Sequence, residues 1–342
     1  MTTPARTILF AASLPLGFLL GGAAAPDAPL RTGPAAASEA AEHSGLQRML
    51  DTALDDERHA IAFYRAVMDK FGERRPFSNI INAERRHEAA LLAQYDRLGL
   101  LPPSDRWAEH AFALPDSFAD ACDASVVAEV RNGALYDEMI GAIEDETVKG
   151  VFERNRWASV ERHLRAFRRH GNGWAPIDAE EPSEKQDEQR RKATGARDAL
   201  FASLFAELSA AMREGGPVNA IGVCAERAPA IAETVSAERG VKIGRTAHRT
   251  RNPDNTPPIW AELILDDLPT QPVYLADRSG RLGAILPIMT ASACTQCHGE
   301  ADALAPGVAG ALAERYPHDR ATGFAEGDLR GWFWVEVPAE PE

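Results

Sequence analysis

The sequence has few cysteines, no excess of positive charge and only one long apolar run, and each shortage excludes a class of protein. Four cysteines in 342 residues are too few for a disulfide scaffold. Asp and Glu number 51 against 37 Lys and Arg, and the formal net charge of −14 argues against a nucleic-acid partner. Hydrophobic residues make up 45% and charged residues 26%, which excludes disorder, collagen and a polytopic membrane protein. The length suggests about two domains.

The apolar run lies at the N-terminus and predicts export. Arg6 supplies the positive charge, residues 8–20 the apolar segment and residues 22–25 the small-residue cleavage site of a signal peptide. We expect cleavage after Ala24, because a cut one residue later would leave a proline at the new N-terminus. An uncleaved anchor is the alternative, but a spanning helix needs roughly 20 residues. We therefore predict that residues 1–24 are removed and that the protein is periplasmic, in an oxidising compartment.

The rest of the chain divides by composition into four segments. In order, they are residues 25–44 (flexible leader), 45–172 (helical domain), 173–194 (polar, solvated linker) and 195–338 (α+β domain). In the last segment we expect one helix that ends at Gly215-Gly216-Pro217 and a second that ends at Gly240. Strands should follow at residues 241–246, 273–276, 282–288 and 332–337.

Carboxylates and histidines recur at helical spacing in the first domain. Glu57 and Tyr64 are two helical turns apart, and Glu84 and His87 are three residues apart, so each pair shares a helix face. The pattern returns about 72 to 76 residues later as Glu129, Tyr136 and His163. A repeated carboxylate helix followed by a Glu-x-x-His helix is how four-helix bundles hold two iron or manganese ions.

These motifs resemble the ferritin and rubrerythrin superfamily, and residues 158–167 resemble a bacterial ferritin-like family of unknown function. Over residues 45–172, the resemblance implies an all-α, antiparallel four-helix bundle, and it leaves oligomerisation through the bundle open. The residues that match ligand positions for iron or manganese are Glu57, Glu84, His87, Glu129 and His163.

One position departs from the full di-iron pattern. Val160 stands three residues before His163, where the pattern has Glu; Glu161 lies on the wrong face unless the helix bulges, and Ser159 is a poor iron ligand. Five ligands could hold one ion, two ions weakly, or none. Alternatively, the paired Glu and Tyr side chains only satisfy each other inside the bundle. We expect the other histidines of this domain to lie at the surface: His59, His110 and His170.

The second domain contains Cys294-Thr295-Gln296-Cys297-His298, the attachment signature of c-type haem. In this motif, two thiols form thioethers to the vinyl groups and the histidine reaches the iron, which makes His298 the proximal ligand. A zinc half-site lacks a second ligand pair here, and a thioredoxin-type pair fits the flanking His298-Gly299 less well.

Several separated motifs in this domain resemble a bacterial single-haem c-type family of unknown function with a PAS-like fold, found alone or as a sensor input module. They are Gly215-Gly216-Pro217, residues 220–224, Ala228-Pro229, residues 241–246, Arg251-Asn252-Pro253, residues 293–299 and residues 327–331. The resemblance covers residues 195–338 and implies a PAS-like sheet with helices packed over the haem.

Other residues are candidates for the haem surroundings. Arginine forks bind carboxylates, so the haem propionates or, equally, solvent are the expected neighbours of Arg245, Arg249 and Arg251. Cys224 matches the recurrent cysteine of the haem family and is our preferred distal ligand, ahead of His248. An open site, an inert buried thiol or a Cys122–Cys224 disulfide are alternatives, whereas Met289 lies too close to the motif in sequence. Residues 332–334 should pack in the core.

Two functions fit these features. The first is an exported c-type haem redox protein, either an electron carrier or a redox or ligand sensor, fused to a ferritin-like bundle with a metal site. The second is a rubrerythrin-like enzyme that reduces peroxide or dioxygen with electrons passed on by the haem. The expected partners are a periplasmic redox protein and a small ligand such as peroxide or dioxygen.

Overall fold

The computed structural model describes the backbone of residues 34–177 and 182–339, and the side chains of these ranges except residues 34–44, 223 and 224. The described residues divide into two units, and the division between Leu46 and Gln47 lies inside the first helix. The predicted signal peptide lies outside the described residues. Among the helices described, none combines the length and the apolar character needed to cross a bilayer.

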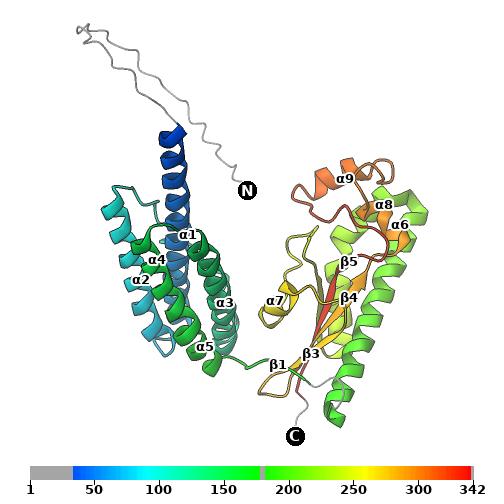
Figure 1. Ribbon diagram of the computed structural model, residues 1–342. Coiled ribbons are helices and arrows are strands. Elements are labelled where there is room, and N and C mark those ends of the chain that lie inside the picture. Colours follow the sequence, from blue (N-terminus) through cyan, green and yellow to red (C-terminus); the bar gives the residue numbers. More distant parts are fainter. Residues whose placement is uncertain (1–33, 178–181, 340–342) are drawn as a thin grey trace, which may run out of the picture. The chain divides into compact units, whose positions relative to one another are not determined.

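The first half of the described chain is entirely helical (Figure 1). Its elements are α1 (Pro34–Phe71), α2 (Phe77–Leu98), α3 (Phe118–Ala142), α4 (Glu146–Ala158), a π-helical turn η1 (Ser159–His163) and α5 (Leu164–His170). The helix ends follow capping rules: the Ser117 side chain accepts from the Asp120 amide at α3, and Asp145 caps α4. Helix α1 begins within the segment expected to be a flexible leader.

An aromatic core joins these helices. The Phe77 ring lies 5.4 Å from Tyr64 and 5.0 Å from Phe167, measured between ring centroids. All three side chains are buried, together with Val67 and Cys122. The core therefore ties α1, α2, α3 and α5 together around one centre.

The second half begins with a long helix that bends back on itself, α6 (Glu184–Arg239). A capping box formed by Ser183 and Gln186 starts this helix within residues 173–194, so much of the expected linker is helical. Gly215 and Gly216 have non-helical dihedral angles and Gly240 ends the helix in the left-handed region, as predicted.

A five-stranded sheet follows, with the strand order β1-β3-β4-β5-β2 and antiparallel pairing throughout. Its strands are β1 (Ala175–Pro176), β2 (Lys242–Thr246), β3 (Val273–Ala276), β4 (Leu282–Met289) and β5 (Leu329–Val337). Four of these strands were predicted from the sequence. The remaining helices are α7 (Ile259–Asp266), the 3₁₀ turn η2 (Ser292–Cys294), α8 (Thr295–His298) and α9 (Val308–Arg315).

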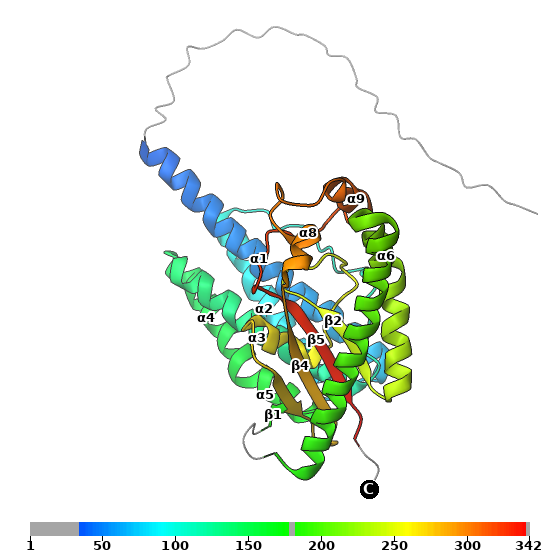
Figure 2. The same ribbon diagram turned by 90° about the vertical axis from the view of Figure 1, so that its right-hand side faces the viewer.

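The sheet is covered on both faces because its side chains alternate (Figures 1 and 2). Leu286 and Phe333 pack against Leu200 of α6, whereas Ile285 and Trp332 pack against α7. The prediction that residues 332 and 333 lie in the core is confirmed.

Candidate functional site

The structure brings the five predicted metal ligands of the helical half together. They form two groups whose ligand atoms lie within 4.8 Å of one another: Glu57, Glu84 and His87, and Glu84, Glu129 and His163. Glu84 belongs to both groups, so its carboxylate lies between the two histidines. The sequence spacing therefore predicted the assembly of this cluster.

The histidine nitrogens face carboxylate oxygens at short range. His87 Nδ1 lies 2.8 Å from Glu84 and 3.4 Å from Glu57. His163 Nδ1 lies 3.1 Å from the other oxygen of Glu84 and 3.4 Å from Glu129. Both nitrogens are buried, and none of these contacts has the direction of a hydrogen bond. Nitrogen and oxygen lone pairs that converge in this way form a donor set suited to a cation.

Two tyrosines hold the outer glutamates in place. Tyr64 donates a hydrogen bond of 2.9 Å to Glu129, and Tyr136 donates one of 2.7 Å to Glu57. Asn155 donates a further bond of 3.2 Å to the same Glu57 oxygen. Each tyrosine thus contacts the glutamate of the other repeat, not its own, and the proposed pairing of Glu57 with Tyr64 is wrong.

The charges of this cluster are strongly coupled. Burial alone would lower the pKa of both histidines, but the adjacent carboxylates outweigh it and raise the pKa of His87 to about 9 and that of His163 to about 10. Burial raises the pKa of Glu57 and Glu129, whereas the two imidazoles overcome burial at Glu84 and lower its pKa. Without a metal ion, the cluster therefore keeps protons on its histidines.

The helix bulges at the position where the fourth carboxylate is missing. The Leu164 amide donates to the Ser159 carbonyl, five residues back, so this turn contains one extra residue. Glu161 nevertheless stays exposed and pairs with Arg165 at 2.8 Å. Val160 packs against α3, where a Cβ on Gly133 would come within 2.7 Å of it. Ser159, four residues before His163, is the buried residue of this turn.

A cavity of about 30 Å³ lies against the cluster. It is lined by Glu57, Glu84 and Glu129 and also by Ser159, Asp56, Asn132 and His59, among others. Asn132 donates to Asp56, and its own Oδ1 is buried without a partner. His59 was expected at the surface, but it is partly buried beside this cavity and contacts Trp107 at 4.6 Å between ring centroids.

Sequence reasoning missed the polar residues around the cluster. Asp56, Asn132 and Asn155 carry no motif spacing of their own, and only their helical phase relative to the ligands would have indicated that they face inward. His110 and His170 are exposed, as expected.

The Cys-x-x-Cys-His motif in the second half forms a compact turn made of η2 and α8. The side chains of Cys294 and Cys297 are partly buried. His298 Nδ1 lies 2.7 Å from the Ala321 carbonyl oxygen. Because a carbonyl only accepts, Nδ1 carries the proton and the lone pair of Nε2 is available. Burial and then the charges of Arg330 and Arg251 lower the pKa of His298 to about 3, which keeps the ring neutral.

Residues 319–324 form a second wall beside this motif. Phe324 and Gly323 amides donate to the carbonyls of His298 and Gly299 at 2.9 and 2.8 Å. Arg251 donates to the Cys297 carbonyl at 2.6 Å and also binds Asp319. No sequence motif indicates this segment, which only lies close in the chain to the family-like motif at residues 327–331.

Four arginines surround the motif, one more than predicted. Arg249 donates to the carbonyls of Thr322 and Gly323 and stacks on Phe324, so its guanidinium already has protein partners, as does that of Arg251. The additional residue is Arg330, whose pKa is lowered to about 10 by burial and by the charges of Arg251 and Arg245. Its guanidinium donates a hydrogen bond to the Arg249 carbonyl at 3.3 Å.

The distal candidates differ in what the structure describes. The Cys224 side chain lies outside the described residues, although its backbone belongs to α6. The His248 ring contacts Phe324, which also contacts His298, so His248 lies near the motif. Cys122 is a free thiol in the core of the helical half, and burial raises its pKa to about 12. The free Cys122 thiol therefore does not support the alternative of a Cys122–Cys224 disulfide.

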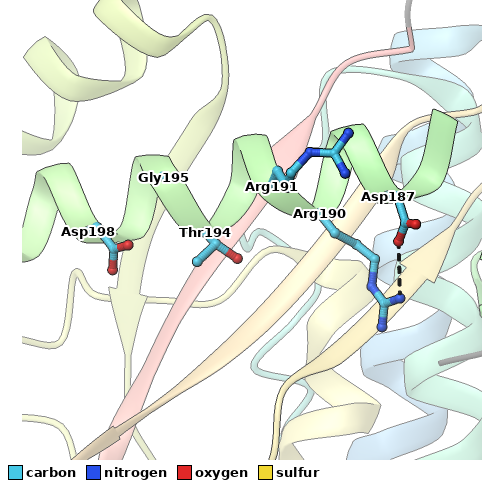
Figure 3. Close-up of a pocket in the computed structure, with 6 residues that line it drawn as sticks. All are labelled: Asp187, Arg190, Arg191, Thr194, Gly195 and Asp198. Carbon is cyan, nitrogen blue, oxygen red and sulfur yellow. Dashed lines mark ion pairs between the residues drawn. The ribbon is translucent and has the colours of Figure 1, made fainter. Parts of the chain in front are cut away.

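An open hollow lies on α6, lined by polar side chains of that helix alone (Figure 3). Asp187 and Arg190 pair there at 3.7 Å, and the other lining residues are Arg191, Thr194, Gly195 and Asp198. These side chains do not converge on a common point, so the hollow reads as a solvated helix face.

Comparison with known proteins gives one family match. The model of the Tll0287-like family matches residues 157–338, more than half of the chain. The crystal structure of the cyanobacterial heme-protein Tll0287 is similar, with 27% identity and a TM-score of 0.35 over 45% of this chain and 98% of that chain. The crystal structure of hypothetical protein MJ0754 from Methanococcus jannaschii DSM 2661 has 20% identity and a TM-score of 0.33, covering 43% and 84% of the two chains. No curated protein shows a significant match.

Proposed function

The chain belongs to the Tll0287-like family, and from this membership we propose that it is a haem redox protein, an electron carrier or a redox or ligand sensor. The family bears the name of Tll0287, which is described as a heme-protein. We assign the haem to the region of residues 195–338, with a PAS-like arrangement of its sheet and helices. When bound, haem supplies one-electron chemistry or a site for a small ligand.

In this proposal, Cys294 and Cys297 attach the haem through thioethers and His298 is the proximal ligand. The observation that carries the assignment is the contact between His298 Nδ1 and the Ala321 carbonyl. It fixes the tautomer, and together with the low pKa it leaves Nε2 as a neutral, oriented ligand atom. A zinc site would use the same orientation of the histidine but lacks a second ligand pair in this sequence, and a thiol-redox pair requires no oriented histidine.

The remaining haem contacts follow from the same arrangement. Cys224 stays our distal candidate on the family resemblance, with His248 as the described alternative near Phe324. For the propionates, the carbonyls that Arg249 and Arg251 bind favour a role in holding the motif. Arg330 is buried among like charges, which an anionic partner would relieve, so we assign a propionate to Arg330.

Acid–acetone extraction tests the covalent link. We expect haem to stay on the wild-type chain and to be lost from the chain that carries Cys294→Ala and Cys297→Ala. Cys122→Ala, which removes a thiol from the helical half, is the matched control and should retain haem. Extraction of haem from the wild-type chain would show that the motif has been misread.

For the helical half, we propose a ferritin-like four-helix bundle that binds iron or manganese through its five predicted ligands. The unpartnered Nδ1 atoms of His87 and His163, each close to two carboxylates, support this assignment. If these histidines and glutamates only hydrogen-bonded to one another, the Nδ1 atoms would lie in hydrogen-bond geometry with the carboxylates.

Metal analysis of the purified holoprotein after anaerobic Fe(II) or Mn(II) loading tests the bundle site. We expect about one to two ions beyond the haem iron, and their loss in Glu84→Ala, because Glu84 serves both groups. Glu161→Ala, a change of an exposed glutamate on the same bundle, should bind as wild type does. Haem iron alone in all preparations would leave the helical half as a docking module.

We further propose that the protein is exported to the periplasm, where a redox protein is its partner. The N-terminal sequence pattern and the need to attach haem outside the cytoplasm support this location. Edman or mass-spectrometric analysis of the periplasmic protein should find Ala25 as the first residue, and recovery of the intact N-terminus from the cytoplasm would contradict export.

A second candidate function is an oxidoreductase that reduces peroxide or dioxygen. The carboxylate of Glu84, shared by two ligand groups, favours this candidate because paired metal sites carry such chemistry. Peroxide should then reoxidise the reduced haem faster in metal-loaded wild type than in Glu84→Ala. Equal rates in the two proteins would support the carrier or sensor.

A further inference from the structure

We propose that a small carboxylate-type monoanion binds beside the metal cluster, in the cavity that the bulged turn η1 leaves next to Ser159. This inference rests on the proposed metal site of the bundle, and it concerns the position of the absent fourth carboxylate. Both its class of ligand and its location follow from the turn, the cavity and the charge of the cluster.

The location follows from the helix register. In an unbroken α-helix the residue three before His163 would share its face, and that residue is Val160. The extra residue in η1 shifts the register, so that Ser159 is buried at the cluster and Val160 packs on Gly133 instead. Ser159, and not Val160, therefore occupies the place from which the fourth carboxylate would extend.

The size of the site suits a small anion. Ser159 and the three ligand glutamates all line the same cavity, which measures about 30 Å³. One water needs roughly 10–15 Å³ on this measure, so the space accommodates a group of about the size of formate. A serine with a free carboxylate beside it takes up much the same space as a glutamate side chain.

The charge of the site favours a single negative charge. Two divalent ions would carry four positive charges, against three carboxylates and two neutral imidazoles in the cluster. One positive charge remains in a buried position, where an uncompensated charge is costly. Asp56 also lines this cavity, but it belongs to neither ligand group, so it leaves the position of the missing carboxylate ligand open.

The polar lining distinguishes between anions of this class. The Ser159 hydroxyl donates a hydrogen bond to an anionic oxygen, and the unpartnered Oδ1 of Asn132 accepts one from a ligand that carries a proton. Formate offers only acceptors, whereas bicarbonate offers acceptors and one O–H group. Both anions accept a hydrogen bond from the Ser159 hydroxyl, and bicarbonate also donates one to the buried Asn132 Oδ1.

Isothermal titration of the holoprotein with Mn(II), in a carboxylate-free and degassed buffer with and without formate or bicarbonate, tests this site. Because linkage is reciprocal, the anion should raise the Mn(II) affinity of wild type on the order of tenfold. Ser159→Ala should weaken this dependence on the anion. Ser159→Glu should bind Mn(II) tightly without any anion, because its own carboxylate fills the cavity. A larger effect of bicarbonate than of formate would identify the protic anion.

Two control variants test the helix register assigned to η1. Two outcomes then distinguish a failure of the metal site from a failure of the anion site. Glu161→Ala, at an exposed position of the same turn, should keep the response to the anion, and Val160→Glu should not replace the anion. Absence of Mn(II) binding to wild type would overturn the metal site and this inference together. Two bound Mn(II) ions with an affinity that no anion changes would overturn this inference alone.

Discussion

Tyr136 donates a 2.7 Å hydrogen bond to Glu57, a residue on another helix and in the other half of the repeat. Its counterpart Tyr64 donates to Glu129 in the same manner. The two pairs differ at Asn155, which donates to the Glu57 oxygen and to the Tyr136 hydroxyl. These two tyrosine–glutamate hydrogen bonds link α1 with α3 and hold the carboxylates of Glu57 and Glu129 in position before any metal binds.

This asymmetry predicts unequal costs for the two tyrosines. Tyr64→Phe should lower the free energy of unfolding of the metal-free bundle by about 1–3 kcal/mol, because it leaves a buried carboxylate oxygen without a tyrosine donor. Tyr136→Phe also removes an acceptor of Asn155, but it should cost less, since Asn155 still donates to the buried Glu57 carboxylate. Urea unfolding followed by far-ultraviolet circular dichroism measures both values. A larger cost for Tyr136→Phe would contradict the role given to Asn155.

Metal binding to the bundle should release protons. In the metal-free protein, the pKa of His87 is about 9 and that of His163 about 10, so both rings are protonated at pH 7. A metal ion binds only the neutral imidazole, and each ion must therefore displace about one proton from its histidine. The apparent affinity should rise about tenfold per pH unit for each ion up to these pKa values.

Calorimetric titration with Mn(II) in two buffers of different ionisation enthalpy measures the number of protons released. Glu161→Ala, at an exposed position of the same bundle, is the control and should release as many protons as wild type. An affinity that is constant between pH 6 and 8 would show that the histidines are not ligands.

The sequence predicted those features that depend on regular spacing. Glu57, Glu84 and Glu129 meet because straight helices preserve their phase, and the strands around Ile285 and Trp332 appear where the apolar pattern placed them. Register changes were beyond such reasoning. Because η1 contains an extra residue, position 159 faces the cluster in place of position 160. No residue type at these positions indicates a π-helical turn.

Long-range contacts could not be predicted from the sequence either. The Ala321 carbonyl binds His298 through a loop that lacks any motif, and Arg330 joins the arginine cluster from a strand remote in sequence. At the start of α6, a capping box overrode the polar composition that suggested a linker.

Arg251 should stabilise the haem motif through its geometry more than through its charge. Its guanidinium donates to the carbonyls of Cys297 and Ala321 while it pairs with Asp319, a set of contacts that a lysine cannot reproduce. Arg251→Lys should therefore cost about 1–3 kcal/mol of stability, read as a lower thermal midpoint of the holoprotein. Arg320→Lys, at a neighbouring exposed position, should leave the midpoint unchanged, and equal midpoints for the two variants would refute the geometric role of Arg251.

The last prediction concerns Arg330, whose effect on stability should change sign when haem binds. Without haem, burial and the like charges of Arg251 and Arg245 disfavour its charged form and lower its pKa to about 10. A folded-state pKa below the ordinary value means that the charged guanidinium opposes folding at neutral pH, and that this cost disappears only as pH rises through about 10. Arg330→Met should therefore stabilise the haem-free chain that carries Cys294→Ala and Cys297→Ala. In the holoprotein, the same change removes a partner of a propionate and should cost about 1–3 kcal/mol. Arg320→Met controls for the loss of one exposed positive charge. Thermal unfolding of the parent, Arg330→Met and Arg320→Met chains, each with and without haem, decides the matter. An effect of Arg330→Met with the same sign in both states would show that Arg330 does not face the propionates.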